Sequence, residues 1–290
     1  MKQIKNMGFS VKERLKNKAA IQKRTFNDIL KFYTMERILY RLSKSGYADK
    51  FILKGALMFK VWDSDKFRPT QDIDLLGTTG NSENNIRRIF ENILTIKVED
   101  DGLDFFPDTI VTSLIKEDAD YHGVRVTFQG KLDTAKIEMQ IDIGFDDIIY
   151  PEPQSVKYPV ILNFPNPDLL VYTKESVVAE KFEAMVQLGN QNSRMKDFYD
   201  IWVLSNNFQF EIKDLAEAVK RTFEHRKTDL SEEILAFTEE FSSLKQIQWK
   251  AFRNKLKQND IPESFSEIMR DIKKFLQPVL EYLKISKTKS

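Results

Sequence analysis

The sequence predicts an α+β protein in which a mixed β-sheet core with flanking helices is followed by a helical C-terminal half. Several short runs between residues 50 and 143 alternate apolar and polar residues, as strands do. Nearly everything after Tyr172 has helical apolar spacing instead. Between these parts, five of the nine prolines fall within residues 151–167, which indicates an extended crossover. We therefore expect two domains, at residues 1–170 and 171–290.

Helices and strands are both expected in the first part. Ser10 is a suitable N-cap for a short basic helix that reaches Arg24, because its hydroxyl can accept from a backbone N–H of the first turn. Helical apolar spacing predicts further helices over residues 25–43 and 82–94. Alternation predicts strands over residues 50–54, 71–76, 109–115, 123–129 and 136–143.

Two helices open the second part. Thr173 or Ser176 would cap the first, and Leu188-Gly189 would end it. Lys181 lies at the edge of its apolar stripe, where a lysine is usually a surface residue. The second helix carries Asp197 and Asp200 on one face, three residues apart. Carboxylates in a first turn also complement the helix dipole without binding any ligand.

Composition excludes several classes of function. The chain has 290 residues, 41% hydrophobic and 31% charged, with a formal net charge of +1, as a globular protein has. Without cysteine it has no disulfide and no thiolate chemistry, and two histidines do not make a His-rich zinc site. We find no secretory segment and no run long enough to span a bilayer, so we expect a cytoplasmic protein without membrane contact.

Two carboxylates flank one apolar residue at Asp72-Ile73-Asp74. Because successive side chains of a strand point to opposite faces, Asp72 and Asp74 share a face while Ile73 anchors the strand in the core. Such a pair suits Mg²⁺, which proteins usually hold by one or two carboxylates plus substrate phosphates. An upstream Gly55 would let the backbone approach those phosphates. Taken alone, however, an Asp-x-Asp is common on exposed strands.

A third carboxylate is available on another predicted strand. The run over residues 135–145 alternates apolar and polar residues and places Asp142 in line with Lys136, Glu138 and Gln140. Two ions that bridge attacking and leaving oxygens need more ligands than one pair supplies, so Asp142 is the candidate third ligand. The alternative is an ordinary polar residue on a solvated face.

These segments resemble a known family. A glycine corner followed by an Asp-x-Asp strand is similar to the signature of the nucleotidyltransferase superfamily. Four segments in order resemble the AbiEii/AbiGii toxin family, from about Arg14 to about Arg226: Lys54-Gly55-Ala56, Arg68-Pro69-Thr70-Gln71-Asp72-Ile73-Asp74, Ala179-Glu180-Lys181 and Lys196-Asp197-Phe198-Tyr199-Asp200. Ala56 stands where the superfamily has Gly or Ser, and the connection to Asp72 is longer than in most members.

The resemblance implies roles for individual residues. Asp72 and Asp74 would bind Mg²⁺, with Asp142 as third ligand from the superfamily arrangement and the strand pattern. Lys181 would contact the triphosphate, and Asp197 would orient Lys181 or the nucleotide. The full nucleotide-binding set is Lys54, Gly55, Ala56, Arg68, Thr70, Lys181, Lys196 and Asp200.

The implied reaction is metal-assisted transfer of a nucleoside monophosphate from a nucleoside triphosphate to an acceptor hydroxyl, with release of pyrophosphate. The family consists of toxins of type IV toxin–antitoxin systems, some of which modify the tRNA 3′ end, which implies an RNA acceptor and a separately encoded antitoxin. A basic surface for RNA is offered by Lys12, Arg14, Lys16, Lys18, Lys23, Arg24, Arg221, Arg226 and Lys227, although solvated helix faces would look the same.

Two alternatives from other classes remain open. One is transfer to a protein or small-molecule hydroxyl by the same active site. The other is a non-catalytic interaction protein on the same fold.

Overall fold

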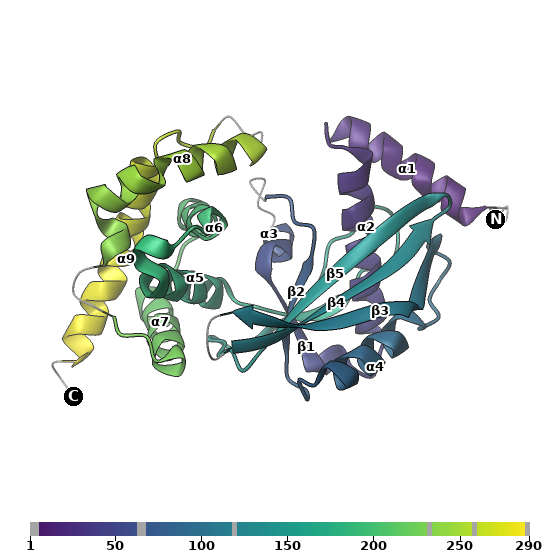
Figure 1. Ribbon diagram of the computed structural model, residues 1–290, viewed down its shortest axis with the longest axis horizontal. Coiled ribbons are helices and arrows are strands. Elements are labelled where there is room, and N and C mark those ends of the chain that lie inside the picture. Colours follow the sequence, from purple (N-terminus) through teal and green to yellow (C-terminus); the bar gives the residue numbers. More distant parts are fainter. Residues whose placement is uncertain (1–5, 63–67, 118–120, 231–233, 257–259, 288–290) are drawn as a thin grey trace. The chain divides into compact units, whose positions relative to one another are not determined.

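A computed structural model describes residues 6–62, 68–117, 121–230, 234–256 and 260–287. The chain forms two compact units, one of Met1–Asp146 with Gln154–Val171 and one of Asp147–Pro153 with Tyr172–Ser290. Within the described ranges, every strand belongs to the first unit, and the second consists of helices and short 3₁₀ turns (Figure 1). No helix in these ranges is long and apolar enough to cross a membrane.

Polar side chains cap three of the helices of the first unit. Thr25 accepts a hydrogen bond from the backbone of Asp28, and Ser82 from that of Asn85, at the predicted starts of two helices. The expectation for Ser10 was wrong: Asn6 caps the first helix, accepting from Phe9 N–H, so Ser10 lies inside the first turn. The helices are α1 (Met7–Ile21), α2 (Phe26–Ser43), α3 (Met58–Val61) and α4 (Glu83–Leu94), with 3₁₀ turns η1 (Ala48–Lys50) and η2 (Gly55–Leu57).

A seven-stranded mixed sheet forms the centre of the first unit, in the order β3-β4-β5-β2-β1-β7-β6. Strand β2 pairs antiparallel with β1 and parallel with β5, and β7 adds parallel to β1. The five predicted strands are present, and β6 and β7 were not predicted. The strands are β1 (Phe51–Lys54), β2 (Ile73–Gly77), β3 (Leu103–Glu117), β4 (Tyr121–Leu132), β5 (Ala135–Phe145), β6 (Gln154–Lys157) and β7 (Asp168–Val171).

The two faces of β2 and β5 differ in polarity. Ile73 and Leu75 of β2, together with Ile141 and Ile143 of β5, are buried in one apolar core with residues of α2 and α4. The alternate positions of both strands point to the other face, where Asp74, Gln140 and Asp142 stay partly exposed and Leu76 is buried. This alternation holds the carboxylates of both strands away from the core.

A buried ion cluster ties α2 to the segment that precedes β3. Asp101 accepts from Arg41 Nη1 at 2.7 Å and from Arg37 Nε at 3.2 Å. Its side chain is 2% exposed, and the two arginine side chains are 0% and 7% exposed. Because charges removed from water are costly unless paired, each member of this cluster needs the others.

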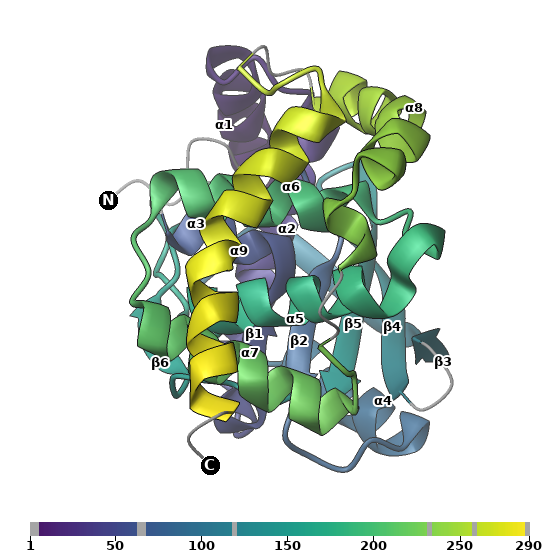
Figure 2. The ribbon, with the colours of Figure 1, turned by 90° about the vertical axis from the view of Figure 1, so that its left-hand side faces the viewer.

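In the second unit, α9 lies against α6, α7 and α8 (Figure 2), and α5 packs against α6 and α7. Thr173 caps α5 by accepting from Ser176 N–H, and Gly189, at a positive φ of 44°, follows its last residue. The helices are α5 (Lys174–Leu188), α6 (Met195–Asn207), α7 (Ile212–Arg226), α8 (Glu239–Leu256) and α9 (Phe265–Lys287), with 3₁₀ turns η3 (Gly189–Gln191) and η4 (Leu235–Phe237).

Replacing Asp101 by Asn should lower the free energy of unfolding by about 3 kcal/mol, because Arg37 and Arg41 would remain buried without a counter-charge. Urea unfolding followed by circular dichroism measures this change. Glu13→Gln is the control, since Glu13 pairs with Lys16 at the surface, where both side chains are nearly half exposed. Equal losses in the two variants would contradict a special role for the buried cluster.

Candidate active site

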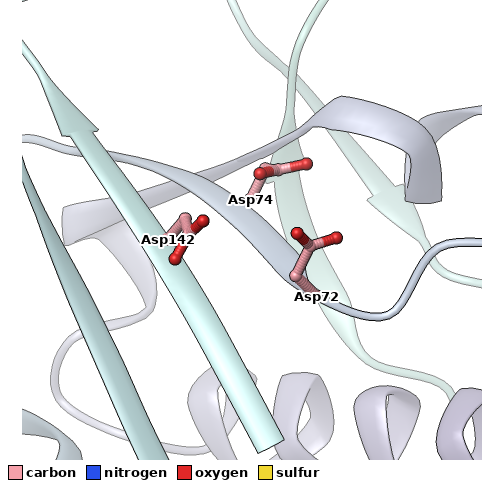
Figure 3. A group of neighbouring side chains, drawn as sticks. All are labelled: Asp72, Asp74 and Asp142. Atoms are coloured by element: carbon pink, nitrogen blue, oxygen red, sulfur yellow. The ribbon is translucent and has the colours of Figure 1, made fainter. Parts of the chain in front are cut away.

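Three carboxylates meet on the polar face of the sheet. The parallel register of β2 and β5 places Asp74 beside Asp142, and Asp72 lies two residues before Asp74 on the same face (Figure 3). One carboxylate oxygen from each lies within 4.8 Å of the others. Hard oxygen donors at this spacing fit a small divalent cation such as Mg²⁺ better than a soft metal. The structure thus brings together the three residues that the sequence suggested as metal ligands.

Neighbouring polar groups fix the orientation of two of these carboxylates. Thr70 Oγ1 donates to Asp72 Oδ1 at 2.6 Å. Arg125 of β4 donates to both oxygens of Asp142, each at 2.8 Å, and Gln140 Nε2 donates to Asp142 Oδ2 at 3.1 Å. The hydrogen bond with Asp142 raises the pKa of the Arg125 guanidinium, with Asp72 and Asp74 adding to the effect. Arg125 therefore places one positive charge beside the three negatively charged carboxylates.

Sequence reasoning missed Arg125. It lies opposite Asp142 only because of the β4–β5 pairing register, and Thr127 lies opposite Gln140 for the same reason. An arginine at a polar position of an alternating strand does not by itself indicate a functional residue. A hairpin alignment of residues 121–132 with 135–145 would have been needed to find it.

The glycine corner lies against the carboxylates. Gly55 has a φ of 72°, in the left-handed region, and a Cβ there would stand 2.6 Å from Asp74 Cγ and overlap the carboxylate. Ala56, which follows it, is buried. Arg68 is partly exposed, and the long connection before it includes residues 63–67, which lie outside the described residues. Only glycine allows this close approach of backbone and Asp74.

A second cluster of predicted residues lies in the second unit, between α5 and α6. Lys181 Nζ lies 2.7 Å from Asp197 Oδ1 and 2.9 Å from Asp200 Oδ2, while Arg194 Nε lies 2.7 Å from Asp197 Oδ2. The Lys181 side chain is only 14% exposed, so the surface interpretation is wrong for it. Lys196, from the same motif, has an exposed side chain.

Electrostatics favour the ionised form of Asp197. Burial raises the pKa of this carboxyl, but attraction to Lys181 and then to Arg194 outweighs burial and lowers the pKa to about 2. The buried lysine and its two aspartates consequently form a fixed charged group rather than a flexible surface one.

Several cations of the proposed basic surface are engaged within the protein. Lys12 pairs with Asp133 at 2.9 Å, and Arg221 pairs with Glu217 at 2.7 Å. Arg226 is held at 2.8 Å by both Asp147 and Glu183. Their charge is therefore partly offset before any RNA arrives.

A mixed sheet that carries three carboxylates beside a glycine corner is the arrangement of a nucleotidyltransferase. Two crystal structures from Helicobacter pylori share the fold, each at 13% sequence identity. One is JHP933, with a TM-score of 0.51 over 90% of this chain and 95% of that one. The other is described as a candidate nucleotidyltransferase, with a TM-score of 0.50 over 86% and 93%. A search of curated proteins gave no match.

The chain belongs to the nucleotidyl transferase AbiEii toxin family of type IV toxin–antitoxin systems, whose family model matches residues 37–271. It is accordingly a nucleotidyltransferase, and membership implies a nucleoside triphosphate substrate and an antitoxin partner. The match begins after Arg14 and continues well past Arg226, so it includes α8 and the start of α9, which the sequence had not linked to the family.

Gly55→Ala should weaken divalent-cation binding about tenfold, because its methyl group would displace the Asp74 carboxylate. Titration of Mn²⁺ followed by electron paramagnetic resonance measures the affinity. Gly46→Ala is the matched control, since no atom lies within 4 Å of a Cβ added there. Equal affinity of the two variants would disprove this role for the corner.

Lys181→Met should destabilise the protein by about 3 kcal/mol at pH 7, because it removes the ammonium that two buried carboxylates share. A carboxyl with a depressed pKa stabilises the fold above its unfolded pKa of 3.8 and loses that contribution as the pH falls towards 2. The gap between wild type and variant should therefore shrink below about pH 4, as urea unfolding at several pH values can measure. Lys196→Met is the exposed control, and a gap that is constant with pH would contradict this account.

Proposed function

We propose that the protein is a Mg²⁺-dependent nucleotidyltransferase that moves a nucleoside monophosphate from a nucleoside triphosphate to a hydroxyl of RNA, most simply the 3′ end of a tRNA. The convergence of Asp72, Asp74 and Asp142 is the observation that carries this proposal. When bound by these carboxylates, Mg²⁺ would offset the charge that develops on the phosphate oxygens. The RNA acceptor is proposed because the toxin family to which the chain belongs includes members that modify the tRNA 3′ end.

In this proposal, some residues of the first unit serve the triphosphate and others serve the acceptor. Gly55, without a side chain, lets the backbone N–H groups of η2 approach the triphosphate, and Ala56 still offers its own N–H. Thr70 holds the orientation of Asp72 through its short hydrogen bond. Asp142 faces the acceptor hydroxyl and takes or directs its proton.

The proposed transfer is a single displacement at the α-phosphorus, in which one bond forms and one bond breaks. The acceptor oxygen forms a bond to the α-phosphorus, the bond from that phosphorus to the bridging oxygen breaks, and pyrophosphate leaves with the electron pair. The hydroxyl proton passes to Asp142 or to solvent. Before substrate arrives, Arg125 holds the Asp142 carboxylate in place with two hydrogen bonds.

In this proposal, Lys181 contributes charge to the leaving group. Its assignment as a triphosphate contact comes from the family pattern, and an ammonium is a compact point charge suited to phosphate. Asp197 and Asp200 fix the direction of the ammonium.

Asp72→Asn and Asp74→Asn should each reduce nucleotide transfer by about a hundredfold or more, because each removes a charge from the metal site. The assay incubates purified protein with each α-labelled nucleoside triphosphate, Mg²⁺ and total RNA, and then resolves label on RNA, protein and small molecules. Asp104→Asn is the control, since its side chain is 67% exposed and pairs with Lys131 at the surface.

Each outcome separates the acceptor classes. Label on tRNA-sized RNA that both substitutions abolish supports the proposal and identifies the nucleotide. Label on protein or on a small molecule replaces RNA by that acceptor. Transfer at the wild-type rate by Asp72→Asn would refute the mechanism.

A further inference from the structure

A polar pocket opens beside Asp72 in the first unit, and the functions assigned so far do not use it. Its volume is about 310 Å³, enough for one small ligand. Asp72 itself lines the pocket, together with Lys31 of α2, Thr127 of β4, and Glu138, Met139 and Gln140 of β5. The pocket therefore shares a wall with the carboxylate group.

Sheet order places this pocket across β2 from the glycine corner. The corner follows β1, the neighbour of β2 on one side, while β5 and then β4 lie on the other side (Figure 1). Thr127 and Gln140 are paired across β4 and β5, on the same face as Arg125 and Asp142. Asp72 and Asp74 thus lie between the corner and the pocket.

The in-line geometry of phosphoryl transfer indicates which substrate this pocket binds. The attacking and leaving oxygens lie on opposite sides of the phosphorus during phosphoryl transfer. If the phosphates that leave are bound at the Gly55 corner, the attacking hydroxyl comes from the side of β5. The pocket is then the place where the acceptor is held.

The chemistry of the lining fits the last nucleotide of an RNA chain. Among the described residues Lys31 makes no ion pair, so it can bind the phosphodiester as a point charge. The exposed Glu138 carboxylate can accept a hydrogen bond from a ribose hydroxyl. Gln140 reaches from the pocket to Asp142, to which it donates at 3.1 Å. Met139 lies between Glu138 and Gln140 on β5 with its side chain buried in the core, so the side chains that face the pocket are polar, which disfavours an apolar protein segment as occupant.

We propose that this pocket binds the 3′-terminal nucleotide of an RNA acceptor, with Lys31 on its 5′-side phosphate and Glu138 on its 2′-hydroxyl, so that the 3′-hydroxyl faces Asp142 and the α-phosphorus. The inference rests on the proposed function and deepens it. It makes Glu138 the residue that distinguishes RNA from DNA, because the 2′-hydroxyl is the group that differs between them.

Lys31→Gln and Glu138→Gln should each raise the KM for RNA about tenfold and leave the KM for the nucleoside triphosphate nearly unchanged, since each removes one charged contact to the acceptor. Lys50→Gln and Glu91→Gln are charge-matched controls on exposed side chains away from the pocket. Fluorescence anisotropy of a labelled RNA in the presence of EDTA gives a second readout that needs no metal and no catalysis.

An RNA that ends in a 2′-deoxynucleotide tests whether Glu138 contacts the 2′-hydroxyl. Wild type should use this RNA about tenfold less well than the unmodified one, and Glu138→Gln should use both almost equally. Lys31→Gln should keep the wild-type preference.

The outcomes separate this inference from the proposed function. If wild type labels RNA but Lys31→Gln and Glu138→Gln both match it in KM and in RNA binding, the pocket assignment is overturned while the function stands. An increase confined to the nucleotide KM also overturns it, since the pocket would then bind the triphosphate. If wild type labels no RNA at all, the proposed acceptor and the pocket assignment fall together.

Discussion

The parallel pairing of β2 with β5 is the constraint on which the site depends. These strands are far apart in the sequence, and their register sets Asp74 directly beside Asp142. A shift by one residue would turn the carboxylates of one strand into the core and bring Ile73 or Ile141 to the surface. The apolar side chains that hold the sheet against α2 and α4 therefore also hold the three carboxylates together. Stability and site geometry have the same origin here.

Opposite charge and backbone shape complete this arrangement. Three carboxylates near one another repel, and Arg125 offsets part of that charge from the neighbouring strand. On the other side of β2, Gly55 allows the chain to pass so close to Asp74 that no side chain fits between them. In the second unit, Lys181 likewise offsets the charge of two carboxylates, those of Asp197 and Asp200. Both groups are charged, and both are held by partners from other elements.

Much of this could be predicted from the sequence, for a physical reason. Alternation in a strand has a period of two, so the sequence indicates that Asp72 and Asp74 share a face and that Asp142 lies on the polar face of its own strand. That these two strands are neighbours was implied only by the superfamily resemblance. Arg125 could not be found in this way, because its position beside Asp142 depends on the register of a hairpin. Asn6 and Ser10 are both good N-cap residues, and the sequence does not say which turn comes first. Strands β6 and β7 lie within and just after the proline-rich segment 151–167, which was interpreted as an extended crossover and not as part of the sheet.

The route of the chain between the units has a consequence for how the protein is made. The chain leaves the first unit after Asp146, spends residues 147–153 in the second, and returns to add β6 and β7 before leaving again at Tyr172. The outer edge of the sheet is thus synthesised only after the chain has begun its second unit. A nascent chain that has just emerged up to β5 exposes the edge of β1 that β7 will later cover. The sheet that carries the carboxylates therefore cannot be completed during synthesis until the residues of β6 and β7 have left the ribosome.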